Sequence, residues 1–160
     1  MMHPKITLYT DGSFRGKLRT GGYAALLTDR YGRFMLVADG SFSTTISRME
    51  LTAVIAGLAY VKDGCDVQVV SDSQYAVNVI NKWLKLWAET DFVRSNGEQV
   101  ANLDLMFQLN WQMARMHRVK AIHIDSHTGN IDQHSLGNDI CDYYAVRSAI
   151  YAYEHPPVFC

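Results

Sequence analysis

Residues 5–13 read KITLYTDGS. The apolar residues Ile6 and Leu8 alternate with more polar neighbours, which is the two-residue period of a half-buried strand. The turn-forming residues Asp-Gly-Ser follow directly. This pattern predicts a first strand over 5–10 that closes at Asp11.

Two further strands follow the first. A basic, glycine-rich turn over 15–22 leads to a strand over about 23–28, a hairpin turn at Tyr31-Gly32 and a strand over 34–42. Consecutive strands joined by short turns are most simply antiparallel neighbours. Residues 5–42 therefore predict one antiparallel group of three strands.

After residue 44 the spacing of apolar residues is typical of a helix, and further along the chain helix and strand patterns follow one another. A helix is predicted over 45–61, ending at Asp63-Gly64, because apolar residues recur there at helical spacing. The later elements are a strand over 67–70, one or two helices over 74–88, a loop over 90–101, a helix over 103–117, a strand over 119–124, a loop over 126–136 and a helix over 138–153. The order βββαβααβα predicts one mixed α/β domain over residues 1–153, with residues 154–160 as a short C-terminal tail.

Composition limits the class of protein. The chain has 160 residues, of which 48% are hydrophobic and 19% charged, with a net charge of −1; this excludes a fibrous or disordered chain and offers no general attraction to nucleic acid. No apolar stretch is long enough for a transmembrane helix, and the first residues lack the apolar core of a signal peptide. Cys65, Cys141 and Cys160 lack zinc-type spacing and fit reduced thiols. We expect a cytoplasmic monomer with no membrane segment and no obligate protein partner.

Four acidic residues occupy positions that a simple core would not give to acids. Asp11 and Asp72 each close a predicted strand, Glu50 lies in the first turns of a predicted helix, and Asp142 extends an apolar helix face. Each has a local alternative: Asp11 as a turn former, Glu50 in a capping box with Ser47, Asp72 as a helix cap, and Asp142 as a charge at a helix N-terminus. No one of these alternatives explains all four acids.

A shared cation is the chemical alternative for the four acids. Carboxylates at close quarters repel and must bind a proton or a metal ion. Oxygen ligands without Cys or His favour Mg²⁺ or Mn²⁺ over zinc. Two such ions about 4 Å apart can activate water and stabilise the leaving oxygen in phosphodiester cleavage. Spacing along the chain leaves open whether the four acids converge.

Five short motifs follow one another along residues 5–152: Thr10-Asp11-Gly12-Ser13, Gly21-Gly22-Tyr23, Arg48-Met49-Glu50-Leu51, Asp72-Ser73-Gln74-Tyr75, and His127 followed by Asn138 and Cys141-Asp142. In this order and on these predicted elements, the chain resembles type 1 ribonuclease H. That family consists of metal-dependent endonucleases that cut the RNA strand of RNA–DNA hybrids. The resemblance implies a ribonuclease H-like five-stranded mixed sheet flanked by helices.

The resemblance also implies a role for each matching residue. Asp11, Glu50, Asp72 and Asp142 would be catalytic carboxylates that hold two Mg²⁺ ions, with Mn²⁺ able to substitute, and His127 would assist proton transfer or product release. The reaction would leave 5′-phosphate ends and serve primer or R-loop removal. The hybrid would contact Gly12, Ser13, Arg15, Lys17, Ser47, Arg48 and Asn138.

Departures from the family pattern bear on the substrate. Lys17 stands where the family often has Asn, and Ile46 and Ser47 stand where two polar amides are common. Hydrogen bonds to the 2′-hydroxyl are what separate RNA from DNA. Two alternatives to hybrid cleavage therefore stay open: a structure-selective DNA nuclease with the same metal site, and a non-catalytic hybrid-binding module.

The basic charge is also placed differently. Residues 81–104, where many bacterial members carry a basic handle, hold three basic and four acidic residues, a formal balance of −1. The turn after Asp11 instead carries Arg15, Lys17 and Arg19. We expect this turn, rather than the handle, to contact phosphates.

Overall fold

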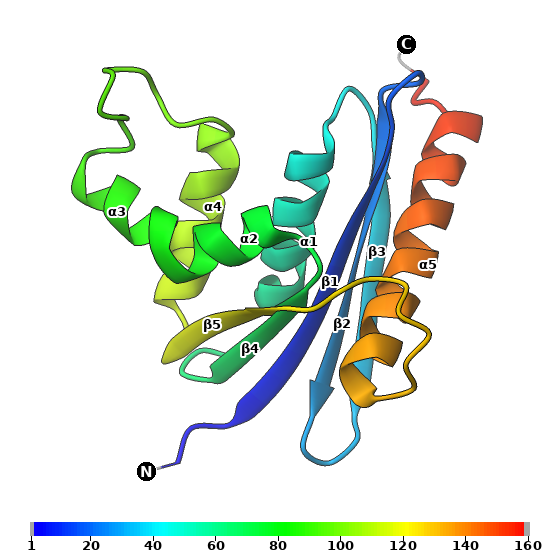
Figure 1. Ribbon diagram of the computed structural model, residues 1–160, viewed down its shortest axis with the longest axis horizontal. Coiled ribbons are helices and arrows are strands. Elements are labelled where there is room, and N and C mark those ends of the chain that lie inside the picture. Colours follow the sequence, from blue (N-terminus) through cyan, green and yellow to red (C-terminus); the bar gives the residue numbers. More distant parts are fainter. Residues whose placement is uncertain (1, 159–160) are drawn as a thin grey trace.

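β1 lies at the centre of a five-stranded sheet (Figure 1). The structure, a computed structural model, describes residues 2–158. The strands are β1 (Lys5–Arg15), β2 (Thr20–Asp29), β3 (Phe34–Ser41), β4 (Asp66–Ser71) and β5 (Arg118–His123). Their order is β3-β2-β1-β4-β5, with β1, β2 and β3 antiparallel neighbours and β4 and β5 parallel to β1. The predicted element order and mixed sheet are confirmed.

Helices cover both faces of the sheet (Figure 1). α1 (Ile46–Ala59) and α4 (Leu103–Ala114) lie on one face, and α5 (Gln133–Glu154) crosses the other. α2 (Gln74–Asn78), the π-helix η1 (Val79–Trp83) and α3 (Leu84–Glu89) follow one another without a break, and α2 and η1 pack beside β5. No helix within residues 2–158 is long and apolar enough to cross a membrane.

Alternate residues of β1 point into two separate cores. Leu8 belongs to the larger core beneath α1, whereas Tyr9 belongs to a smaller core beneath α5, together with Cys141. This is the two-residue period that the sequence predicted. Cys65 and Cys141 are free and buried, while Cys160 lies outside the described residues.

The first hairpin is longer than the sequence predicted. β1 does not close at Asp11 but continues to Arg15, and β2 begins at Thr20 rather than at residue 23. The parallel partner β4 ends where Ser71 pairs with Thr10, but β2 goes on pairing with β1 up to the Arg15–Thr20 pair. Because an antiparallel neighbour still supplies hydrogen bonds, the Asp-Gly-Ser stretch stays extended instead of turning.

The helix boundaries also differ from the prediction. α1 and α4 end at Ala59 and Ala114, two and three residues early, and α5 begins at Gln133, five residues before position 138. Asp132 caps α5 by accepting hydrogen bonds from Ser135 N (3.1 Å) and Ser135 Oγ (2.8 Å). The first turn of α5 has no apolar stripe, so hydrophobic periodicity could not find it. The Asp132-x-x-Ser135 pair was the available signal.

An asparagine covers the backbone edge of β5. Asn81 in η1 donates from Nδ2 to Ala121 O (2.8 Å) and accepts from Ala121 N at Oδ1 (2.8 Å). Its amide thus replaces the pairing that a sixth strand would make with β5. The contact holds the α2–α3 segment, which begins two residues after Asp72, against the sheet.

Candidate active site

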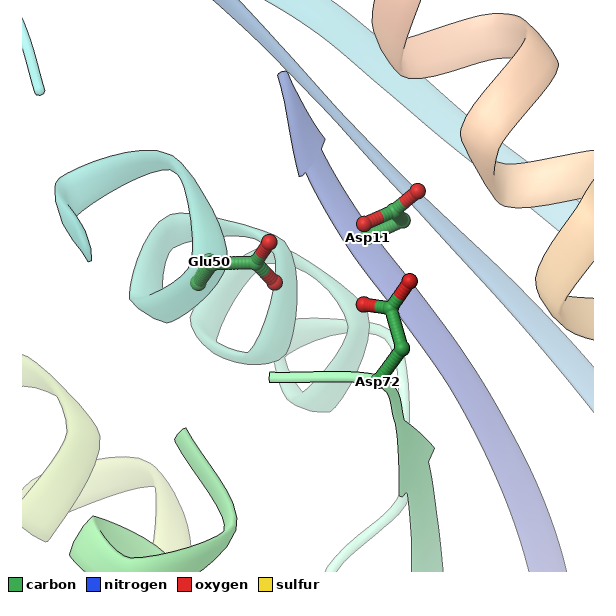
Figure 2. A group of neighbouring side chains, drawn as sticks. All are labelled: Asp11, Glu50 and Asp72. Atoms are coloured by element: carbon green, nitrogen blue, oxygen red, sulfur yellow. The ribbon is translucent and has the colours of Figure 1, made fainter. Parts of the chain in front are cut away.

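Three carboxylates from three elements meet where β4 ends. Asp11 lies within β1, Glu50 in the second turn of α1 and Asp72 directly after β4. One oxygen from each lies within 4.8 Å of the other two, and Figure 2 shows the three carboxyl groups pointing toward one another. Thr10 pairs with Ser71 in the parallel register, so the next residues of the two strands, Asp11 and Asp72, lie side by side.

Gly12 explains how Glu50 reaches this point. A Cβ atom at Gly12 would lie 2.7 Å from Glu50 N and 2.9 Å from Met49 C. The start of α1 therefore rests directly on the backbone of β1, a distance that only glycine permits. The close approach places Glu50 next to Asp11.

We expect Gly12→Ala to destabilise the protein by about 1–3 kcal/mol, since its methyl group overlaps α1 backbone atoms that cannot move independently. For a chain of this length the melting temperature should fall by roughly 2–4 °C per kcal/mol, measured by calorimetry. Gly16→Ala is the matched control, because a Cβ there meets only Phe14 Cε1 at 3.7 Å. Equal melting temperatures for the two variants would show that α1 can shift away from β1.

Burial and mutual repulsion disfavour full ionisation of the cluster. Asp11 and Glu50 are 4% and 6% exposed, and burial is the largest cause that raises the pKa of each. The negative charges of Glu50, Asp72 and Asp142 raise the pKa of Asp11 further. Burial likewise raises the pKa of Asp72. Without a cation the cluster must therefore share a proton near neutral pH.

The local alternatives for Glu50 and Asp72 do not hold. Thr45 is the N-cap of α1, accepting from Arg48 N at 3.2 Å, so Ser47 does not form a capping box with Glu50. Ser73, not Asp72, caps α2 by accepting from Ala76 N. Neither carboxylate therefore caps a helix.

Asp142 and His127 lie beside the three-carboxylate cluster. Asp142 is in the third turn of α5, so the helix N-terminus does not explain its charge. Its oxygens are not among the group within 4.8 Å. His127 has a left-handed backbone (φ 52°), and its Nε2 is 3.9 Å from Asp142 Oδ1. The structure therefore places the fourth acid and the histidine together at the rim of the cluster.

Comparison with known proteins decides the family. The sequence model of the family described as RNase H matches residues 3–150. The chain belongs to the RNase H family. The ribonuclease HI of Pasteurella multocida is 38% identical over 92% of each chain, and that of Haemophilus ducreyi is 37% identical over 90% of each. The ribonuclease H of Sulfurovum sp. is 39% identical over 91% of this chain and 90% of its own.

Solved structures agree on the fold of this chain. LC9-RNase H1, a type 1 RNase H with the type 2 active-site motif, superposes with a TM-score of 0.77 at 23% identity, covering 94% of this chain and 74% of its own. The foamy viral protease–reverse transcriptase in complex with RNA/DNA hybrid superposes with a TM-score of 0.78 at 16% identity, covering 94% and 21%. The predicted resemblance is confirmed.

The carboxylate cluster of this chain fits a hard divalent cation. Its donors are all oxygens, and Glu50 Oε2 is buried with no hydrogen-bond partner within residues 2–158. An unpaired buried oxygen costs free energy that a bound ion would recover. The donor set matches the ligands that Mg²⁺ and Mn²⁺ prefer.

Arg48, which was expected to contact substrate, is hydrogen-bonded to the start of α4. Its Nη1 and Nη2 donate to the two oxygens of Asp104 at 2.9 and 2.6 Å, and Nη1 lies 3.5 Å from Asn102 Oδ1. These hydrogen bonds lower the pKa of Asp104 to about 2. Asn138, also expected at the substrate, is 2% exposed, and its Nδ2 has no partner within the described chain. Their substrate contacts stay predictions.

The other expected substrate residues divide into two groups. Ser13 and Ser47 are half-buried close to Asp11 and Glu50 in the chain. Arg15 and Lys17 are exposed where β1 turns into β2. Because β1 stays extended, Arg15 lies about 13 Å beyond Asp11 along the strand. The basic turn therefore lies away from the carboxylate cluster, and its contact with substrate stays a prediction.

Proposed function

We propose that this chain is a metal-dependent endonuclease that hydrolyses the RNA strand of RNA–DNA hybrids and leaves 5′-phosphate ends, in primer or R-loop removal. The observation that carries the proposal is the cluster of Asp11, Glu50 and Asp72, assembled from three elements in a member of the RNase H family. Buried carboxylates with raised pKa values have no evident structural use here. They suit a site that binds divalent cations.

Asp11, Glu50, Asp72 and Asp142 would hold two Mg²⁺ ions, with Mn²⁺ able to substitute. Bound ions would supply an activated water and charge stabilisation at the leaving oxygen. The carboxylates would hold the cations in place and balance their charge. The burial of Asp11 and Glu50 excludes bulk water from the inner side of the site. Asp142, more exposed than Asp11, lies at the open side together with His127.

The contact between His127 and Asp142 supports a role for this histidine at the rim of the site. Its imidazole is largely exposed and its Nε2 is 3.9 Å from Asp142 Oδ1, so it is open to solvent and lies next to an expected metal ligand. We propose that it assists proton transfer or product release. Ser47 and Ile46, at the start of α1, would face the hybrid, and Ile46 is 44% exposed.

A cleavage assay on labelled substrates tests the proposed function. Matched RNA–DNA hybrid, duplex DNA and branched DNA are each incubated with Mg²⁺, with Mn²⁺ and with EDTA. We expect cleavage of the RNA strand of the hybrid only, and none in EDTA. Preferred cleavage of branched DNA would identify a structure-selective DNA nuclease, and no turnover with either metal would identify a binding module. Monomeric state and cytoplasmic location stay predictions.

We expect hybrid affinity to depend on the basic turn more than on the handle. Arg15, Lys17 and Arg19 are exposed and have no carboxylate partner within residues 2–158. Replacing all three with Ala should reduce the slope of log Kd against log salt by up to about 2–3 units, since each phosphate contact contributes roughly 0.9. The slope is measured in Ca²⁺ to prevent cleavage.

The matched comparison is a variant of the handle. Lys82 and Lys85 are exposed in a segment with a formal balance of −1. Replacing both with Ala should change the slope by less than about one unit. If the handle variant loses more slope than the basic-turn variant, the handle binds substrate despite its charge.

A further inference from the structure

The segment that carries His127 has few contacts of its own. Residues 125–131, between β5 and α5, are all exposed. Within the described chain their one hydrogen bond is local, from Asn130 N to Thr128 Oγ1 (3.2 Å). The position of His127 must therefore depend on how the two ends of the segment are held.

One end of the segment is held beside the carboxylate cluster. Ile124 N donates to Ser71 O at 3.0 Å, in the residue before Asp72. His123 Nε2 lies 3.0 Å from Asp72 O. This end of the segment is therefore fixed to the end of β4, next to Asp72.

The other end is the first turn of α5, and a tyrosine of β1 holds it. Tyr9 is 1% exposed, and its hydroxyl lies 3.1 Å from His134 Nδ1. The helix rests on the same ring: a Cβ atom at Gly137 would lie 2.5–2.6 Å from three atoms of the Tyr9 ring. Tyr9 therefore supports the first turn of α5 by ring contact and by one hydrogen bond.

The hydrogen bond joins distant parts of the chain. Tyr9 and His134 are 125 positions apart. Either tautomer of the imidazole serves, because the tyrosine hydroxyl can donate or accept. Tyr9 lies two residues before Asp11 in β1, and alternation puts both side chains on one face of the sheet. A single strand thus carries a carboxylate of the cluster and the support for the His127 segment.

We propose that Tyr9 and His134 are a positioning pair that holds the first turn of α5 on β1 and thereby sets the position of His127 relative to Asp11 and Asp142. The proposal rests on the proposed function of His127. Neither residue of the pair touches the reacting groups. Loss of the hydrogen bond lets the first turn loosen, since helix ends already have unpaired backbone groups, and His127 is then correctly placed for a smaller fraction of the time.

The test is a set of single and double substitutions assayed on the labelled hybrid. We expect Tyr9→Phe and His134→Ala each to lower kcat about three- to tenfold, the scale of one hydrogen bond, with KM little changed. His134→Asn, whose Oδ1 can take the place of Nδ1, should recover most of the loss. Tyr144→Phe is the control, because it removes a hydroxyl from an exposed tyrosine of α5.

Combining Tyr9→Phe with His127→Ala shows whether the loss of kcat arises through His127. If the pair acts through His127, then Tyr9→Phe should cause no further loss in the His127→Ala background. An equal loss in both backgrounds would mean that Tyr9 acts through Asp11, and it would overturn the proposal. Unchanged kcat for Tyr9→Phe in the wild-type background would overturn it as well.

Hydrogen exchange provides a readout that does not need activity. The amides of Ser135 and Leu136, which donate to Asp132 in the first turn, should exchange faster in Tyr9→Phe and His134→Ala but not in Tyr144→Phe. Unchanged exchange would overturn the proposal. A wild-type chain without any cleavage would instead overturn the proposed function. Hydrogen exchange keeps the two failures distinguishable, because faster exchange in Tyr9→Phe and His134→Ala would still show that the pair holds the first turn of α5.

Discussion

Asp11→Asn should reduce cleavage of the RNA–DNA hybrid by at least about 10³-fold, because bound cations contribute several kcal/mol and each 1.36 kcal/mol is tenfold in rate. The substitution is nearly isosteric, so it opens no cavity and the chain should stay folded. The assay is the initial rate of hybrid cleavage in Mg²⁺. Asp139→Asn is the control, since Asp139 is exposed on α5. Substantial remaining activity would mean that Asp11 is not a primary ligand.

The same variant should be more stable than the wild type when no metal is present. Burial and neighbouring acids raise the pKa of Asp11 in the folded chain above its unfolded value near 4. The folded state therefore binds more protons than the unfolded state, and stability falls as pH rises above that unfolded value. In EDTA at about pH 7, Asp11→Asn should melt higher, by roughly 2–4 °C for each kcal/mol of repulsion that it removes.

The pH dependence of the melting temperature distinguishes the loss of carboxylate repulsion from a general stabilisation of the fold. Between about pH 5 and pH 8 in EDTA, the melting temperature of the wild type should fall more steeply than that of Asp11→Asn. Saturating Mg²⁺ should reverse the order, because the wild type gains ligand-binding free energy that the variant lacks. Parallel pH curves for the two proteins would contradict the assignment of the repulsion to Asp11.

His127→Ala should lower kcat by about 10- to 1000-fold, the usual scale for a positioned acid–base group. Its side chain is largely exposed and makes no core contact, so the melting temperature should not change. Metal affinity and hybrid affinity in Ca²⁺ should also stay close to those of the wild type. His155→Ala, at the far end of α5, is the control. An unchanged kcat would make His127 an ordinary loop residue.

The expected losses of activity in Asp11→Asn and in His127→Ala differ for a structural reason. Asp11 is 4% exposed and lies in one cluster with Glu50 and Asp72. No water or neighbouring side chain can therefore take its place as a metal ligand. His127 lies in an exposed segment at the rim, where water can carry a proton in its place, though less efficiently. The buried acid should therefore matter more than the exposed histidine.

The order of elements could be predicted from the sequence because it depends on local period. Ile6 and Leu8 mark a strand by alternation, and Leu51, Val54 and Leu58 mark α1 by helical spacing; all but the half-buried Ile6 are buried as expected. The acidic residues could also be singled out in this way, since an acid that continues an apolar pattern is visible in the sequence itself.

Element ends could not be predicted, because they depend on partners distant in the sequence. Ser47-x-x-Glu50 fits a capping box as well as Thr45-x-x-Arg48 fits the cap that forms. Both patterns are local, so the sequence does not choose between them; in the structure Thr45 is the cap, and the start of α1 packs against β1 at Gly12. In the same way, β1 continues past Asp11 because β2 is still beside it.

The sequence by itself determined the strands, the helices and the identity of the four acids, because side-chain period and residue type are local properties. The tertiary structure decided that three acids converge, through the parallel pairing of β1 with β4 and the close contact of α1 with Gly12. It also decided that Tyr9 supports the start of α5, a contact across 125 positions. Such contacts follow from how elements pack, and no local pattern specifies a packing partner.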